Sequence, residues 1–219
     1  MKIPYNGLMI ISYQGVESFK VQFGDIIIAY NPVSKDSKFK SIKYGADIAL
    51  VSTNHPDFNG ADMASRGDRM PFVISGPGEY EIKEVFIKGF QSESHYAGAP
   101  RLNTIYTVLL EGINLCFLGA LNGPLPSDML EEIDEVDILF VPIGGEGVLD
   151  PSQAYKLAAS LEPKLIIPMH YGDIGDKNAL KTFLKEGGEE SVKPVDKLTI
   201  KKKDLEGKEG DVVVLEPTL

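Results

Sequence analysis

The sequence predicts a single α/β domain spanning residues 1–219, and three observations support this prediction. The first two thirds of the chain consist of short β-rich runs separated by turn residues. The last third alternates strand-like and helix-like segments, as in a parallel sheet. The composition, with 43% hydrophobic and 25% charged residues, is that of an ordinary globular domain with one sizeable core.

The chain opens with three β-rich runs, at residues 8–13, 19–23 and 25–30. They predict an antiparallel meander, because they are short and separated by glycines. Residues 47–51 then form a continuous apolar run, which is the pattern of a strand covered on both faces. This strand leads directly into a polar segment, residues 53–58.

The middle of the chain continues as strands with turns between them, at residues 71–74, 85–89, 104–110 and 113–118. Gly76-Pro77-Gly78 and Glu111-Gly112 mark two of the turns. The last of these strands ends in the small-residue loop 119–123, much as the earlier buried strand ends in the polar segment. The predicted strands 47–51 and 113–118 are therefore both followed by a loop at the corresponding end.

The last third predicts helices at residues 127–133, 151–160 and 177–186, because Ser127 can cap the first and Pro151 suits the first turn of the second. Buried strands are predicted at 137–141 and 164–168. The apolar runs 198–200 and 212–215 are predicted to be edge strands that complete the sheet.

Net charge and composition limit which binding partners and which cellular compartment are expected. A net charge of -10 opposes binding to nucleic acid or to an anionic membrane, so a small-molecule ligand or substrate is expected, with a homo-oligomer left open. Residues 1–7 lack the pattern of a secretion signal, and no apolar run approaches the roughly 18 residues of a spanning helix. The single cysteine, Cys116, fits a reducing compartment, so a cytoplasmic location is expected.

The three histidines, His55, His95 and His170, each follow a predicted strand. Strand ends at one edge of a sheet converge, so residues far apart in sequence can form one site there. Asp57 lies two residues after His55 and can point into the same cavity. A lone histidine is more often structural, and an aspartate after Pro56 is equally well explained as a turn residue. Because all three histidines lie at strand ends, a shared functional site is favoured over three separate structural roles.

Residues 45–60 resemble the signature region of metallo-β-lactamase-fold hydrolases, in which a buried strand precedes H-x-H-x-D-H. Four further segments resemble, in the same order, the lactonase-like predicted zinc-dependent hydrolases of that superfamily: residues 76–82, 103–106, 137–145 and 163–171. The resemblance covers nearly the whole chain. It implies a four-layer αββα sandwich with its site at the strand-end edge.

The resemblance also implies where metal ligands would lie, and three of these positions carry other residues. Thr53 and Phe58 replace histidines, and Ala120 replaces a bridging aspartate. The four remaining ligand groups are His55, Asp57, His95 and His170. The resemblance therefore implies at most one divalent ion, and three nitrogens with one carboxylate suit Zn²⁺ best.

Two functions remain open on this basis. One is a single-metal hydrolase of ester, lactone or phosphoester bonds, in which Asp57 leaves the ion to accept a proton from water and His170 orients or protonates the leaving group. Because four ligands at once would close the site, the alternative is a non-catalytic relative, with or without a metal. Such a protein would bind a small molecule or a protein partner in the same cleft.

Overall fold

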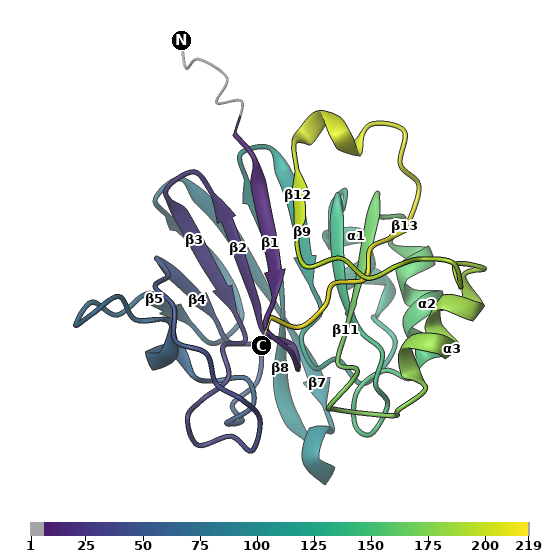
Figure 1. The fold of residues 1–219 in the computed structure, drawn as a ribbon, viewed down its shortest axis with the longest axis horizontal. Coiled ribbons are helices and arrows are strands. Elements are labelled where there is room, and N and C mark those ends of the chain that lie inside the picture. Colours follow the sequence, from purple (N-terminus) through teal and green to yellow (C-terminus); the bar gives the residue numbers. More distant parts are fainter. Residues whose placement is uncertain (1–6, 219) are drawn as a thin grey trace.

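A computed structural model describes residues 7–218 and arranges the strands in two stacked sheets (Figure 1). Residues 1–6, on which most of the argument against a secretion signal rests, and Leu219 lie outside the described residues. Between residues 7 and 218, no helix is both long enough and apolar enough to cross a membrane.

The six-stranded sheet contains, in spatial order, β12 (Leu198–Ile200), β1 (Met9–Tyr13), β2 (Phe19–Phe23), β3 (Ile26–Tyr30), β4 (Ile48–Leu50) and β5 (Phe72–Ile74). Strands β1, β2 and β3 form the predicted antiparallel meander, and β4 and β5 continue the sheet in parallel. Alternate residues of β1 and β2 are buried, so one face of the meander packs in the core and the other is partly exposed.

The seven-stranded sheet contains, in spatial order, β13 (Asp211–Val212), β11 (Leu165–Met169), β10 (Ile138–Pro142), β9 (Ile113–Phe117), β8 (Arg101–Leu110), β7 (Val85–Ser94) and β6 (Gly78–Ile82). Strands β9, β10, β11 and β13 are parallel, and β6, β7 and β8 are antiparallel. The aromatic rings of Phe19 and Phe140, one from each sheet, lie 4.8 Å apart in the core between the sheets.

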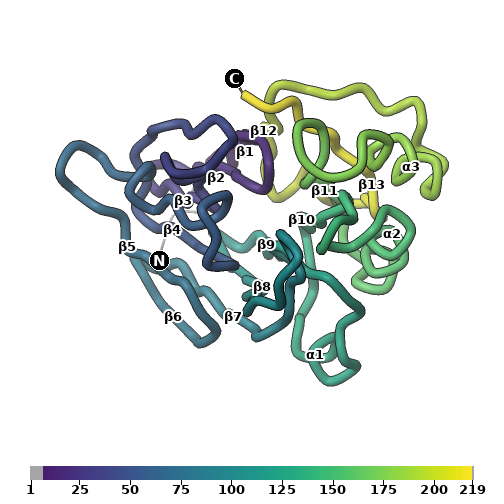
Figure 2. The backbone as a smooth tube through the Cα atoms, turned by 90° about the horizontal axis from the view of Figure 1, so that it is seen from below, coloured from purple at the N-terminus to yellow at the C-terminus, as the bar shows by residue number. Residues whose placement is uncertain are grey.

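Three α-helices follow β9 in the described chain: α1 (Ser127–Glu132), α2 (Pro151–Ser160) and α3 (Ala179–Glu186). The start of α2 is fixed by a capping box, in which Asp150 accepts from the Gln153 N–H at 2.8 Å and Gln153 accepts from the Asp150 N–H at 3.2 Å. Figure 2 shows α2 and α3 beside β10, β11 and β13, away from the six-stranded sheet.

The predicted α/β sandwich is confirmed, with three differences in its elements. The expected helical layer outside the six-stranded sheet is reduced over β3 and β4 to the 3-10 helix η1 (Ala61–Ala64), because the outward residues Ala29 and Ala49 are small enough for a short turn to cover. The sequence did not predict strand β6, because its residues are largely exposed and polar and so lack the apolar pattern of a strand. The tail strands β12 and β13 complete different sheets rather than one.

The β7–β8 hairpin is the longest pair of strands among the described residues. Each of its strands is 10 residues long, so both are longer than the strands predicted at residues 85–89 and 104–110. Both extend beyond the neighbouring strands at the lower end of Figure 1. The connection between them contains the 3-10 turn η2 (Tyr96–Gly98). The hairpin therefore carries His95 and Tyr96 to the edge at which the other strand-end loops gather.

Burial raises the pKa of six tyrosines above the usual value of 10.0: Tyr13, Tyr30, Tyr44, Tyr96, Tyr106 and Tyr171. Their contribution to stability is complete below pH 10 and is lost as the pH rises, because the unfolded chain then releases protons that the folded chain retains. Each group lowers the free energy of unfolding by up to ~1.4 kcal/mol per pH unit above that point. We expect phenolate absorbance to rise together with loss of circular dichroism. Ionisation of all nine tyrosines near pH 10 in folded protein would contradict this.

Candidate functional site

Loops from both sheets meet at one edge of the sandwich, as the histidine positions predict. The backbone of the loop after β4 contacts β8 through the Thr104 N–H, which donates to the Ser52 carbonyl at 2.8 Å. The β7–β8 connection contacts the loop after β10, where the His95 N–H donates to the Gly147 carbonyl at 3.0 Å. These bonds fix the segments that carry the candidate residues.

Asp57 lies at the centre of this edge and is 3% exposed. One carboxylate oxygen accepts a hydrogen bond from the Ser37 hydroxyl at 2.5 Å. The other accepts from the Tyr96 hydroxyl at 2.6 Å and lies 3.3 Å from Nδ1 of His55. Both oxygens are therefore already engaged by neighbouring side chains.

His55 is half-buried beside Asp57, and the Asp57 N–H also lies 3.3 Å from its Nδ1. Burial lowers the pKa of His55; Asp57 opposes this effect, whereas Arg101 and Lys38 add to it. The imidazole is therefore expected to be neutral at pH 7, with a nitrogen lone pair available.

His170 is completely buried and pairs with a buried carboxylate, Glu17, through Nδ1 at 2.6 Å. The second Glu17 oxygen accepts from the Asn31 amide at 3.0 Å. His170 Nε2 has no hydrogen-bond partner among the described residues. A histidine held by a carboxylate through one nitrogen while the other is free is the arrangement found behind many metal-ligating histidines.

Two aromatic rings pack against these groups. The Tyr96 ring lies 5.0 Å from that of His55 and 5.4 Å from that of His170, close to perpendicular in both cases. The Phe58 ring lies 4.8 Å from Tyr96. Both rings belong to a buried apolar cluster that includes Val16, Val33, Ala120, Val148 and Ile174. We call Tyr96 and Phe58 the aromatic plug.

His95 lies elsewhere. It is exposed, and it lines a cavity of ≈ 430 Å³ together with Glu93, Leu121 and Asn122. The structure thus brings His55 and Asp57 together, and the ring of Tyr96 packs against both His55 and His170. It does not gather the predicted set of four: within residues 7–218, no three His, Cys, Asp or Glu side chains are grouped so that they could hold a metal ion.

The positions that lack the expected ligands are joined by hydrogen bonds. Asn103 Oδ1 accepts from the Thr53 hydroxyl at 3.1 Å and from the Ala120 N–H at 3.0 Å. The Asn103 amide nitrogen donates to Ser92 at 2.8 Å and to the Leu118 carbonyl at 2.9 Å. Thr53 and Ala120 are therefore parts of a satisfied buried network rather than gaps in a metal site.

Stacked mixed sheets with a polar site at the strand ends define the architectural class of metallo-β-lactamase folds. Residues 10–170 match the family model described as the β-lactamase superfamily domain. The chain belongs to this family and, by its fold, to the metallo-β-lactamase superfamily.

Relatives with similar sequences are named metal-dependent hydrolases. The UPF0173 metal-dependent hydrolase of Lysinibacillus sphaericus (strain C3-41) is 26% identical over 198 residues, which covers 74% of this chain and 85% of the relative. A Listeria innocua protein of the same name is 27% identical over 196 residues, with the same coverage. A crystal structure of a proposed Zn-dependent hydrolase from Thermotoga maritima has a TM-score of 0.74 and 29% identity, covering 95% of this chain and 98% of the other.

These names imply a divalent ion at the strand ends, but the residues of this chain do not fit one. Asp57 has both oxygens hydrogen-bonded, and the ring of Tyr96 packs against the imidazoles of both His55 and His170. Phe58 offers no ligand atom, and His95 lines another cavity. Among the described residues of this site, the feature that resembles a metal ligand is the buried Nε2 atom of His170, which has no hydrogen-bond partner.

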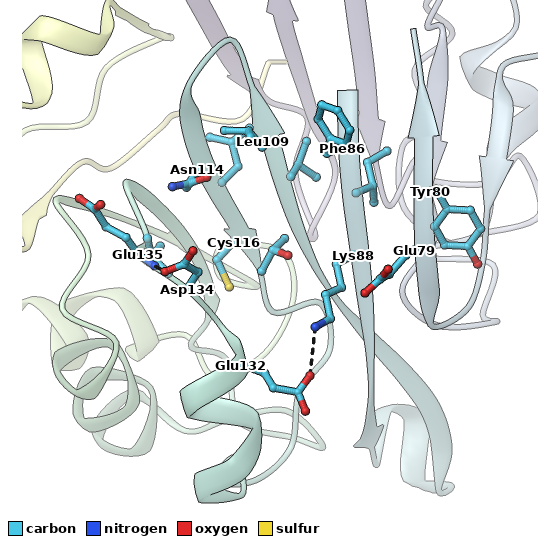
Figure 3. Close-up of a pocket in the computed structure, with 15 residues that line it drawn as sticks. Glu79, Tyr80, Phe86, Lys88, Leu109, Asn114, Cys116, Glu132, Asp134 and Glu135 are labelled. Atoms are coloured by element: carbon cyan, nitrogen blue, oxygen red, sulfur yellow. Dashed lines mark hydrogen bonds and ion pairs between the residues drawn. The ribbon is translucent and has the colours of Figure 1, made fainter. Parts of the chain in front are cut away.

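A second cavity, of ≈ 390 Å³, lies on the seven-stranded sheet along β7, β8 and β9 (Figure 3). Phe86 and Leu109 line it and are partly exposed, and Lys88 pairs with Glu132 across it at 3.0 Å. Cys116 also lines it but is 1% exposed, and burial raises the pKa of its thiol to about 12. The thiol is therefore protonated at neutral pH, as expected for a buried cysteine rather than a nucleophile.

Sequence reasoning missed four residues that shape the site: Glu17, Ser37, Tyr96 and Asn103. The only sequence signal at Asn103 is the family resemblance. Tyr96 directly follows His95, so the prediction at His95 identified the correct loop. It did not identify Tyr96, rather than His95, as the side chain that points into the site. Glu17 lies in a turn between two strands, where a carboxylate is ordinarily exposed.

Proposed function

We propose that this chain is a non-hydrolytic, metal-independent member of the metallo-β-lactamase superfamily that binds a small molecule at the strand-end edge. The observation that supports this proposal is the hydrogen bonding of the Asp57 carboxylate. Its two oxygens accept short hydrogen bonds from Ser37 and Tyr96, so a metal ion or a water molecule must compete with these two donors for the carboxylate. Hydrogen bonds to both oxygens also make the carboxylate a weaker base toward water.

The cavity beside His95 is the place where we expect the ligand. Its ≈ 430 Å³ are within the range of small-molecule sites, and it combines apolar side chains such as Leu121 and Met129 with polar ones such as Glu93 and Asn122. His95 thus contributes to ligand binding rather than to a metal centre. Absence of nucleic-acid and membrane partners, the oligomeric state and a cytoplasmic location stay predictions from composition.

The second candidate is the single-metal hydrolase of ester, lactone or phosphoester bonds. The paired state of His170 favours it, since Glu17 holds Nδ1 while Nε2 is free. The names of the relatives favour it as well. It would require Tyr96 to move away from Asp57 and from the two imidazoles against which its ring packs, and therefore ranks second.

A substrate panel separates the two candidates. Esters, lactones and phosphodiesters are incubated with the protein after chelator treatment, and again with added Zn²⁺, Mn²⁺ or Fe²⁺. We expect no turnover above buffer under any condition, because Ser37 and Tyr96 donate to Asp57 and the ring of Tyr96 packs against both imidazoles. Metal-dependent hydrolysis that disappears in His55→Ala would refute the proposal and establish the hydrolase.

A further inference from the structure

We propose that the cavity on the outer face of the seven-stranded sheet is a second ligand site, and that its ligand is a small organic cation, an amine with an apolar body. The cavity lies along β7, β8 and β9 (Figure 3). It shares no lining residue with the cavity beside His95. The inference therefore goes beyond the proposed function and does not depend on it.

The floor of this cavity contains a pair of apolar side chains. Phe86 and Leu109 are direct cross-strand partners, and they are 51% and 40% exposed. Their neighbours Ile87 and Val108 belong to the core between the sheets, so Phe86 and Leu109 point outward. Two large apolar side chains that lie together on an exposed sheet face form a surface that the body of a ligand can cover.

Carboxylates border the apolar pair on two sides. On one side lies Glu79 of β6, opposite Lys88 in the strand register. On the other side, the end of α1 and the turn that leads to β10 supply Glu132, Asp134 and Glu135 (Figure 3). The lining thus contains four carboxylates and a single amine, that of Lys88.

The amine of Lys88 is already engaged, because it pairs with Glu132 at 3.0 Å. Within residues 7–218, no ion pair involves Glu79 or Asp134. The remaining negative charge attracts an ammonium group and repels a carboxylate or a phosphate. The exposed ring of Phe86 adds a cation–π attraction for an ammonium group.

The size and charge of the cavity favour a small molecule over a second copy of the chain. Its volume of ≈ 390 Å³ is within the range of small-molecule sites. A symmetric contact between two copies at this face would bring two sets of carboxylates together, in a chain whose net charge is -10. A small ammonium ligand carries the complementary charge instead.

The experiment titrates the full-length protein with n-octylamine and, separately, with octanoate, which has the same chain length and the opposite charge. Backbone amide shifts in proton–nitrogen correlation NMR spectra report where each probe binds. We expect n-octylamine to cause saturable shifts at Phe86, Leu109 and Asp134. We expect octanoate to bind there at least ~10-fold more weakly, because the bordering carboxylates repel it.

Two sets of variants test the apolar floor and the carboxylates separately. Leu109→Ser should weaken n-octylamine binding at least ~5-fold. Leu102→Ser is the matched control, since Leu102 also lies on β8 and is 48% exposed but does not line the cavity, and it should leave binding unchanged. Glu79→Gln combined with Asp134→Asn should reduce the preference for n-octylamine over octanoate. Circular dichroism checks the fold of each variant, and the charge variant tests the inference even if Leu109→Ser does not fold.

Four results would overturn the inference. The first is the absence of saturable shifts at the cavity, and the second is equal binding of n-octylamine and octanoate there. The third is a set of n-octylamine shifts confined to residues around His95, which would support the proposed ligand cavity at the strand-end edge instead. The fourth is a change of the Phe86 and Leu109 amide shifts with protein concentration alone, which would show that a second copy covers this face.

Discussion

Glu17→Ala is expected to lower the free energy of unfolding by about 3 kcal/mol or more, because it removes the partner of a completely buried histidine. Glu17 and His170 are both 0% exposed, and they join the turn after β1 to the end of β11. Loss of the carboxylate leaves Nδ1 of His170 without its acceptor and removes one of the two acceptors of the Asn31 amide, which keeps its bond to Ser52. Urea unfolding followed by circular dichroism measures the change.

Glu17→Gln is the matched control for this substitution. It keeps the volume and one acceptor oxygen, so it should retain the bond from either His170 or Asn31 and cost clearly less than the alanine variant. If Glu17→Ala unfolds within about 0.5 kcal/mol of wild type, the buried pair is not the structural tie described here.

Gly119→Ala is expected to destabilise the protein by roughly 3 kcal/mol, through backbone strain and a steric clash together. Gly119 has a φ of +58°, which disfavours a residue with a side chain. An added Cβ would lie 2.5 Å from Ser52 Cβ and 2.6 Å from Asn103 Oδ1. The substitution therefore pushes apart the loops after β4 and β9 and disturbs the acceptor of Thr53.

Gly123→Ala provides the control within the same loop, since an added Cβ at Gly123 meets no atom within 4 Å. It should change the free energy of unfolding by less than about 1 kcal/mol. Equal effects of the two substitutions in urea unfolding would show that close approach at Gly119 is not what fixes these loops.

Much of the fold was predictable because hydrophobic period and turn residues agree along the chain. Met9, Ile11 and Tyr13 alternate with less buried residues, which fits the predicted meander strand, and the apolar run of β10 is buried throughout, as predicted for a buried strand. Strand β6 lacks such a signal, because Glu79 and Glu81 are exposed and its pairing with β7 depends on backbone hydrogen bonds.

The site was predictable only in its location. Topology brings the loops that bear His55 and His170 to one edge whatever their side chains do. Which side chain of His95 and Tyr96 enters the site depends on the length of the β7–β8 hairpin and on the left-handed residue Ala97 in its turn, with φ 57°. The family resemblance implied that ligands are missing at Thr53, Phe58 and Ala120, but it carried no information on which side chains surround these positions.

The zinc stoichiometry of the wild-type protein, purified without chelator and dialysed before elemental analysis, tests the central claim most directly. The central claim is that no metal ion binds beside Asp57, because the Tyr96 hydroxyl donates to this carboxylate and the Tyr96 ring packs against the imidazoles of His55 and His170. We predict far less than one Zn²⁺ per chain in wild type and in Tyr96→Phe. One Zn²⁺ per wild-type chain, lost in His55→Ala, would contradict the claim.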